Sequence, residues 1–517
     1  MKRLVLALIF IALASVASQG QEADTLTLLS VKEVKQQNVW LSGENPAGLS
    51  LNRFRSFSVA QAGYAYQKED FGIIGRPTSK DAYTVSAKSF QRFGNASLYG
   101  LISYVLRNNH RQSWNSMSGG QWSPVNLADS LPGRQRAEEY NLSGGVSHFI
   151  GRQWTVGAQF DYQVQLTAKD TDPRNRNQWM EWQLTPGTSY RCENLRLGAS
   201  LLYAVSKESV GIRNMGPHTV YPIFASYPLA FYRTLPQDDD VNWNYRSHRM
   251  GAALQADLSQ ESFQLFQQFN ASFVHQEVES NRIQNRSEGE ADGWQAGYKV
   301  ILQRQVNYAL HKWNGEATLR HTRNYDPLQR QPDGGLWQTY GRVLRSTRQE
   351  ADASLTYRFR RMHDARHPRY TLAASVHYHQ AVSSLFFYPT EYSQPTYRID
   401  ARTTLCRHIR LPHNAQLDLS LCLQGGSGGG TLLRKNLAST EQGAPDIPLW
   451  QNSLLRQQNF AYETGLRWAL HPAVGYARPF TGNAGSWFIR LTGSYERIHN
   501  LPCPNGEEIV AQIGWLF

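Results

Sequence analysis

Apolar and polar residues alternate along most of the chain. In the segment Trp154–Asp170, apolar side chains occupy every second position from Trp154 to Leu166, and mostly polar residues fill the positions between them. Because successive side chains leave a strand on opposite sides, this period of two predicts a strand with one apolar and one polar face. The same alternation recurs at Leu197–Val205, Trp294–Leu302, Gln416–Gln424 and Trp487–Tyr495.

The connections between these segments differ in length. Tight turns are expected at Gly94–Asn95, Gly151–Gln153, Glu193–Asn194 and Leu411–Asn414, and long loops near 108–137, 209–242 and 426–455. Short turns at one rim and long loops at the other are typical of outer-membrane barrels, whereas a soluble sandwich lacks this asymmetry. The pattern predicts an all-β fold, an antiparallel transmembrane β-barrel over residues 56–517. We expect about 18 strands, although 14 or 16 also fit the pattern.

The chain ends on a strand-like segment, Glu507–Phe517, with apolar residues at alternate positions. A strand in lipid must pair all of its backbone groups, so the last strand is expected to close against the first. The ending resembles the C-terminal signal of outer-membrane proteins, which has a final aromatic residue, alternating apolar residues and a glycine. This resemblance implies that the barrel-assembly machinery recognises Gly514, Trp515 and Phe517.

Residues 1–20 have the pattern of a cleaved secretory signal peptide. Lys2 and Arg3 precede an apolar stretch from Leu4 to Leu13, and small residues follow. The apolar stretch is shorter than the roughly 20 residues that a spanning helix needs. We therefore expect export to the outer membrane of a Gram-negative cell, where lipid and lipopolysaccharide surround the barrel.

The formal net charge of the chain is +12, and this charge is spread over its whole length. A nucleic-acid partner would require a localised basic face, so none is predicted. The surplus charge is instead expected to line the lumen or to face anionic lipid and solutes.

Residues 21–55 precede the first strand and contain the turn-rich stretch Asn45-Pro46-Ala47-Gly48-Leu49. This stretch resembles the element near the start of FadL-type channels, the long-chain fatty-acid transporter family. In that family the N-terminal segment folds into the barrel as a hatch. None of the family's binding-site motifs is found, so the chain is more similar to outer-membrane barrel families of unknown function (DUF type) with a FadL-like entry. The alternative is a turn that merely leads into the first strand.

Three consecutive segments near 354–361, 371–380 and 397–408 place charged side chains on their polar faces. The candidate lumen-lining residues are Arg358, Arg360, His377, His379, Arg398, Asp400 and Arg402. A cationic inner wall would select or slow anionic solutes, because low-dielectric walls focus the electric field. The alternative is that these residues are the polar lining that any wide barrel has.

Cys406 and Cys422 share the polar parity on the two sides of Asn414. In a hairpin centred on Asn414 they would be directly opposed, and a disulfide between them is plausible in an oxidising periplasm. The alternative is two small residues that face the lumen.

No credible catalytic arrangement is found in the sequence, and we predict no enzyme, no cofactor and no metal site. His377 and His379 could approach a transition ion together with His408, but no carboxylate or thiol is certain to join them. The glycine-rich stretch Gln424–Thr431 lacks the lysine of a phosphate-binding loop and is expected to begin a flexible loop.

The loop near 209–242 combines aromatic residues, prolines and the aspartates Asp238–Asp240. It could fold inward as a gate, receive a partner at the cell surface, or pack only on itself. The leading hypothesis is a channel or transporter for a small or amphipathic solute, with a gated polar lumen. The alternative is a non-transporting barrel that serves as a structural, assembly or secretion partner of a surface or periplasmic protein.

Overall fold

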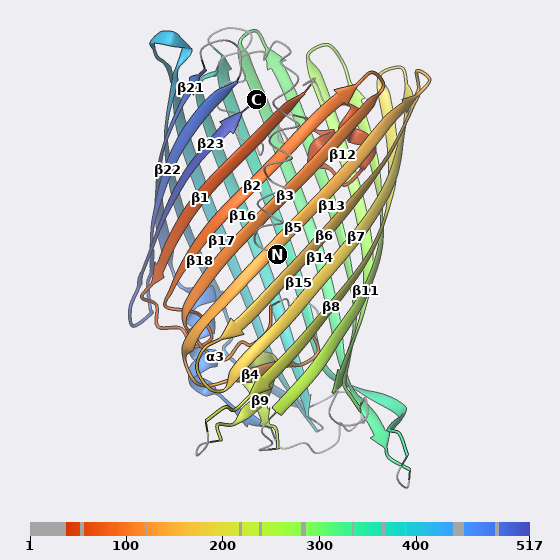
Figure 1. The fold of residues 1–517 in the computed structure, drawn as a ribbon, viewed down its shortest axis with the longest axis vertical. Helices are drawn as coiled ribbons and strands as arrows, with labels where there is room; N and C mark the ends of the chain where they lie inside the picture. Colours follow the sequence, from red (N-terminus) through yellow and green to blue (C-terminus); the bar gives the residue numbers. More distant parts are fainter. Residues whose placement is uncertain are drawn as a thin grey trace.

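A computed structural model describes most of the chain as one β-barrel (Figure 1). The described residues are 38–51, 56–118, 123–216, 220–236, 240–280, 286–332, 335–362, 368–387, 389–437, 449–480 and 485–516. The predicted signal peptide, residues 21–37 and Phe517 lie outside the described residues.

Eighteen antiparallel strands close the barrel, which confirms the predicted fold and strand number. They are β1 (Phe57–Glu69), β2 (Ser79–Phe93), β3 (Ala96–Gln112), β5 (Gly133–Ile150), β6 (Trp154–Lys169), β7 (Arg174–Cys192), β8 (Leu195–Arg213), β11 (Asp240–Ser259), β12 (Phe263–Ser280), β13 (Arg286–Val306), β14 (Ala309–Arg330), β15 (Gln338–Met362), β16 (Pro368–Phe387), β17 (Thr390–Arg410), β18 (Gln416–Gly430), β21 (Arg467–Pro479), β22 (Ser486–Ile498) and β23 (Asn505–Leu516).

The remaining elements are short and lie at the ends of the barrel. They are the strands β4 (Asn126–Asp129), β9 (Ile223–Tyr227), β10 (Phe231–Thr234), β19 (Arg434–Leu437) and β20 (Trp450–Gln451), the 3₁₀ turns η1 (Trp40–Ser42), η2 (Pro46–Leu51), η3 (Pro228–Ala230) and η4 (Pro412–Asn414), and the helix α3 (Ser453–Thr464). In the part of the chain that the structure describes, no helix is both long and apolar enough to cross a bilayer.

The last strand pairs with the first, as predicted. In the register of β1 and β23, Val59 faces Leu516 and Glu69 faces Gly506. Trp515 is exposed on the outside of the barrel. Gly514 packs against the ring of Phe488, and a Cβ at Gly514 would lie 2.7 Å from the carbonyl oxygen of Ala60. A glycine is therefore required where the barrel closes.

The apolar faces point outward on every strand for which the sequence predicted them. Exposed side chains of this surface include Leu201, Phe160, Leu355, Val376, Leu405, Leu421, Ile489 and Ile513. Aromatic pairs border this band. Trp154–Tyr190, Trp313–Tyr357 and Tyr476–Trp487 lie near the short turns, and Tyr64–Tyr83, Tyr104–Tyr140 and Trp182–Tyr203 lie nearer the long loops. An apolar band between two aromatic girdles is the exterior of an outer-membrane barrel.

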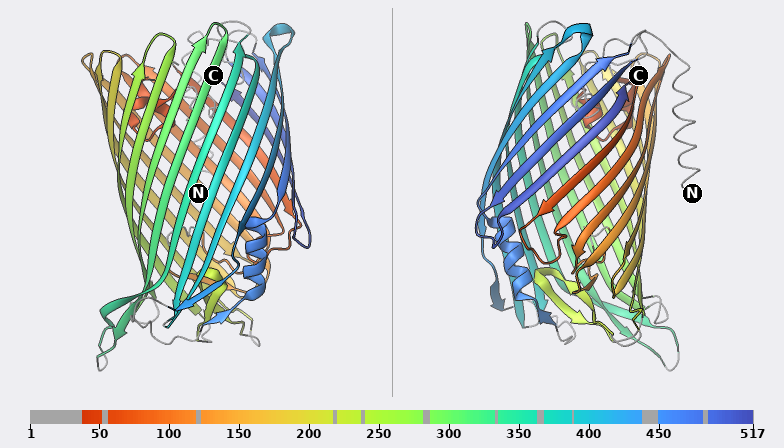
Figure 2. Two further views of the ribbon diagram at one scale, coloured as in Figure 1. Left: turned by 180° about the vertical axis from the view of Figure 1, so that it is seen from behind. Right: turned by 60° about the vertical axis from the view of Figure 1, so that its left-hand side comes forward.

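The two ends of the barrel differ, as the connection lengths indicated. The short turns lie at the end that holds the C-terminus, and the long connections lie at the opposite end (Figures 1 and 2). The strands β14 and β15 are the longest, with 22 and 25 residues. Their hairpin projects beyond the rim at the long-loop end (Figure 2).

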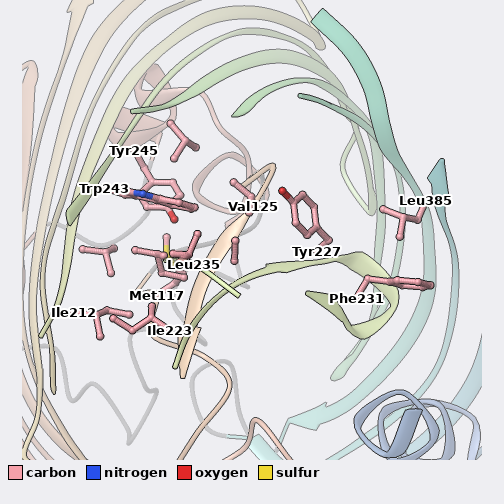
Figure 3. Packing of buried hydrophobic residues seen from close by; sticks show 14 of the residues in the cluster. Met117, Val125, Ile212, Ile223, Tyr227, Phe231, Leu235, Trp243, Tyr245 and Leu385 are labelled. Atoms are coloured by element: carbon pink, nitrogen blue, oxygen red, sulfur yellow. The ribbon is translucent and has the colours of Figure 1, made fainter. Parts of the chain in front are cut away.

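At the long-loop end, connecting segments fold into the barrel and form a second sheet, in the order β20-β10-β9-β4. Apolar side chains of this sheet pack against the inner wall, where Trp243 and Tyr245 of β11 and Ile212 of β8 face inward (Figure 3). We call the sheet, its connections and α3 the loop cap. The elements β9, η3 and β10 of the 209–242 loop thus fold inward, which is one of the outcomes expected from the sequence, and Asp238 and Asp239 lie outside the described residues.

The glycine-rich stretch is part of β18 rather than the start of a flexible loop, so that expectation is wrong. The stretch also contains the letters Gly-x-Ser-x-Gly at Gly425–Gly429, but a regular strand lacks the sharp turn that exposes a nucleophilic serine. Gly428 faces α3, because a Cβ there would lie 3.0 Å from Cα of Thr464. The small residues therefore make room for a helix of the loop cap.

Candidate functional site

Residues 38–51 lie inside the barrel at the short-turn end. We call them the inner plug. The turn η2 contacts the inner faces of β3, β5, β6 and β7. Val39, Trp40, Ala47 and Leu49 are buried, and Trp40 packs edge-on against Phe266 of β12 with a centroid separation of 5.5 Å. The inner plug therefore contacts one continuous arc of the wall, from β3 to β12.

Asn45, the first residue of the NPAGL stretch, fixes the plug to the wall. Its Nδ2 lies 2.8 Å from the carbonyl oxygen of Thr188 and 3.0 Å from Oε1 of Gln255. Its Oδ1 accepts a hydrogen bond of 3.0 Å from the backbone N–H of Ala47. Trp40 Nε1 donates to Asp257 Oδ2 at 2.7 Å. These buried polar groups of Asn45 and Trp40 are thus paired with the wall or within the plug, as a stable docked state requires.

Three glycines of neighbouring strands form the groove that receives this turn. A Cβ on Gly157 of β6 would lie 2.7 Å from Pro46 C and Ala47 N, which are backbone atoms. Added Cβ atoms on Gly187 and Gly198 would collide with the side chain of Asn45. Only glycine lets the plug backbone approach the wall this closely. We call Gly157, Gly187 and Gly198 the glycine groove.

At the opposite end, buried polar contacts join the loop cap to the wall. Lys169 of β6 forms an ion pair with Asp129 of β4, and the two side chains are only 2% and 3% exposed. Arg233 of β10 binds Glu288 of β13 at 2.7 Å. Burial raises the pKa of Asp129 even though Lys169 stands beside it. The desolvation of the Asp129 carboxylate therefore affects its pKa more than the attraction to Lys169 does. Removing either partner would leave a buried charge without its counter-ion.

Between the plug and the cap, charged side chains line the middle of the lumen. His377 is 42% exposed although it faces inward, and Asp352 is 37% exposed, so a solvent molecule can reach this part of the lumen. The predicted residues on β15, β16 and β17 are brought together, since His379 faces Arg398 and His377 faces Asp400 in the strand register. The wall that they form is mixed in charge, because Asp352 lies 2.8 Å from His379 and Asp400 lies 2.7 Å from Arg398.

The remaining predicted lumen residues also lie on the inward parity. Arg402 Nε contacts Cys422 Sγ at 2.8 Å. Arg358 lies opposite Lys312 in the strand register, and Arg360 is buried. The arc β5–β7 carries acids and amides instead: Gln163 Nε2 donates to Glu139 Oε1 at 2.9 Å. The middle of the lumen therefore has a mainly basic arc and an acidic, amide-rich arc.

Comparisons with known proteins place the chain in one family. A model of DUF6850, described as a family of unknown function, matches residues 46–517. This chain belongs to DUF6850. No curated protein sequence matches it.

Solved structures with a similar barrel share little sequence with this DUF6850 chain. The RagAB peptide importer has a TM-score of 0.42 at 8% identity, over 90% of this chain and 87% of that chain. The ferric preacinetobactin receptor BauA from Acinetobacter baumannii has a TM-score of 0.40 at 7% identity, over 89% and 80%. The outer-membrane transporter YddB from Escherichia coli has a TM-score of 0.39 at 8% identity, over 90% and 81%. These likenesses assign no solute to the DUF6850 chain.

A hydroxyl, an imidazole and a carboxylate line up on adjacent strands of the basic arc. Thr371 Oγ1 lies 3.2 Å from His408 Nε2, and His408 Nδ1 lies 2.7 Å from Asp418 Oδ1. The strands around them are paired throughout, so their backbone N–H groups are not free to stabilise an oxyanion. The three side chains therefore fit a hydrogen-bond network of the lumen.

Among the described residues, no group of three or more His, Cys, Asp or Glu could hold a metal ion.

The expected opposition of Cys406 and Cys422 is wrong. Cys406 faces Ser420, and Cys422 faces Thr404. The hairpin is centred on His413 rather than Asn414, because Arg410 pairs with Gln416 around the turn η4. This one-residue change of centre shifts the two thiols out of register by two residues, and both cysteines are free.

A thiol titration checks this correction. All four cysteines are free in the structure, so denatured protein purified without reductant is expected to release four thiol equivalents, and reductant should add none. A cysteine-free variant serves as the blank. Two equivalents that rise to four on reduction would show a disulfide and contradict the register.

The sequence reasoning named the 209–242 loop as a possible gate but missed the wall residues on which the loop cap packs, although a signal was present. Val210, Ile212, Trp243 and Tyr245 lie on the polar parity of their strands, at the ends next to the 209–242 loop. Apolar side chains that face a water-filled lumen are stable only when another segment packs against them. Apolar residues at these otherwise polar inward positions could therefore have indicated an inserted loop.

Proposed function

We propose that this chain is a gated outer-membrane channel for a small hydrophilic solute, and that the structure is its closed state. The observation that carries the proposal is the location of the two obstructions. Both the inner plug and the loop cap lie inside the barrel but belong to connecting or terminal segments, so they can move without breaking the wall. Gates of outer-membrane barrels are built in this way, by segments folded into the lumen.

The solute class follows from the middle of the lumen. Its lining consists of charged and amide side chains with few apolar groups, so a hydrated or hydrogen-bonding solute fits better than a fatty chain. Arg348, which is 48% exposed although it pairs with Glu350, lies on the basic arc together with Arg358, Arg398 and Arg402. Because the barrel wall has a low dielectric constant, these charges would raise the local concentration of anions. We therefore propose a preference for small anionic solutes.

Planar-bilayer recordings test the proposal. The full-length protein is expected to conduct rarely, and a variant that lacks residues 38–51 should open at least tenfold more often. If both proteins are silent, while the intact barrel co-purifies with another protein in mild detergent, the alternative of a docking or assembly partner is favoured instead.

Selectivity provides a separate test in the variant without the inner plug. Changing Arg348 and His377 together to glutamate is expected to lower the chloride-to-potassium permeability ratio about tenfold, since one cation and one imidazole of the basic arc become anions. In the matched control, Arg304 and Arg323 are changed to glutamate instead; both are exposed on the outer surface. A reversal potential that shifts equally in both variants would contradict the proposed role of the basic arc.

A further inference from the structure

Outward-facing cations gather on one arc of the barrel exterior, above the aromatic girdle. On β8, Lys207 and Arg213 share the outward parity of Leu201, which is 62% exposed. On β11, Arg246 shares the parity of Met250, which is 60% exposed. On β7, Arg174 and Arg176 share the parity of the exposed Leu184. We call these five residues the basic arc of the exterior.

The strand register sets like charges directly opposite each other in this arc. Lys207 faces Arg246 across β8 and β11, and Arg174 faces Arg213 across β7 and β8. Like charges directly opposite on one face of a sheet destabilise it. An anion held between them would relieve this repulsion.

The carboxylates near the arc neutralise only part of its charge. Arg174 binds Asp172 at 2.9 Å and Arg213 binds Asp240 at 2.7 Å. Glu277 faces Arg246 in the register. Within the described residues, however, Arg176, Lys207 and Arg246 form no ion pair, and all three are exposed. The excess positive charge is therefore centred on these three residues.

The arc lies at the height of the lipid headgroups. Lys207 lies four residues after Tyr203 on β8, and Arg246 lies four residues before Met250 on the antiparallel β11. Four residues span ~10 Å along the membrane normal for a tilted strand. Below the arc, the exterior is apolar and suits acyl chains. The long-loop end is the outer side of such a barrel, where the leaflet consists of phosphorylated glycolipid.

The neighbouring arc shows that this charge does not run around the whole rim. On β12 and β13 the corresponding outward positions carry Glu277, Glu290 and Asp292, which pair with His275 and with Arg342 of β15. These ion pairs leave no excess of positive charge on the neighbouring arc, so an anionic headgroup is attracted to the cations of β7, β8 and β11 instead.

We infer that the basic arc of the exterior, on β7, β8 and β11, is a binding site for the phosphorylated headgroup of an outer-leaflet glycolipid of the lipid A type. The phosphates lie between the opposed cations, and the acyl chains lie along the apolar band beneath. The site is independent of the proposed transport, because it faces away from the lumen.

The test measures binding of purified lipid A to the full-length protein in detergent by native mass spectrometry. Exchanging Lys207 and Arg246 together for glutamine (K207Q/R246Q) is expected to weaken binding about 30-fold, the effect of two cations near a lipid surface. The matched control R304Q/R323Q removes two exposed outer arginines elsewhere and should bind like the parent. The heat-induced shift of the barrel on SDS gels verifies that each variant is folded.

Three further ligands decide between sources of the anion. Dephosphorylated lipid A should bind at least tenfold more weakly than lipid A, and inorganic phosphate and phosphatidylglycerol should compete only at much higher concentration. Unchanged lipid A binding by K207Q/R246Q would overturn the inference. So would equal binding of phosphatidylglycerol or of free phosphate, since the site would then recognise any anionic lipid or any phosphate.

Discussion

Replacement of Gly157 by alanine is expected to release the inner plug and to raise the open probability of the barrel at least tenfold in planar bilayers. The new Cβ would lie 2.7 Å from backbone atoms of Pro46 and Ala47, and backbone cannot yield as a flexible side chain does. Overpacking of this kind costs about 1–3 kcal/mol. The strand itself tolerates alanine, so the cost falls on the docking of residues 38–51.

The neighbouring Gly145 of β5 offers a matched control for this prediction. It also faces inward, but a Cβ there would meet Tyr99 at an ordinary distance of 3.6 Å. Gly145→Ala should therefore leave the open probability unchanged. If Gly157→Ala stayed closed while its barrel remained folded, the glycine groove would not hold the plug.

Exchange of Lys169 for methionine is expected to make opening of the loop cap dependent on pH. Asp129 would then be buried without its cation, and burial already raises its pKa in the native protein. When the cap is released, Asp129 is solvated and its pKa returns to about 3.9. A carboxyl group whose pKa is higher in the docked state stabilises docking below the solvated value, and this stabilisation is lost as pH rises through the docked value. The variant should therefore open at least tenfold more often at pH 8 than at pH 5.

The double variant with Lys169→Met and Asp129→Asn separates the charge from the loss of packing. It lacks the titrating carboxyl group, so its opening should not change between pH 5 and pH 8. The native protein should vary little over this range, because Lys169 remains beside Asp129. An equal pH response in the single and double variants would assign the effect to another group.

The barrel could be predicted from the sequence because its cause is local. Strands bury one face in lipid, so the period-two pattern marks each of them, and the segment predicted from Trp154 coincides with β6. The outward faces of Leu355, Val376 and Leu405 were predicted for the same reason. The closing pair β1–β23 follows from the need to satisfy every backbone group in lipid.

The inner plug and the loop cap could be predicted only in part, because they depend on contacts between distant segments. The NPAGL stretch indicated a hatch, but the glycine groove joins residues that lie more than 100 positions away in the chain. No periodic pattern in the sequence predicts such a close fit between residues that are distant in the chain. The cysteine register failed for a smaller reason, since the centre of the η4 turn differs by one residue from the expected centre.

The loop cap shows a further limit of the sequence pattern. Short segments such as Asn126–Asp129 and Phe231–Thr234 have too few residues to show a strand period, and they form a sheet only because the barrel wall surrounds them. Their partners were visible as apolar residues at inward positions, of which Trp243 is the clearest.

The most direct test of the account is the accessibility of the middle of the lumen. His377→Cys, in a chain whose four native cysteines are replaced by serine, places one thiol between the inner plug and the loop cap. Its reaction rate with a membrane-impermeant thiol reagent is measured in lipid vesicles from either side. The account predicts slow labelling in this background and at least tenfold faster labelling when Gly157→Ala is added and the reagent is on the plug side. Equally fast labelling without that change would show that the lumen is not closed, and would contradict the account.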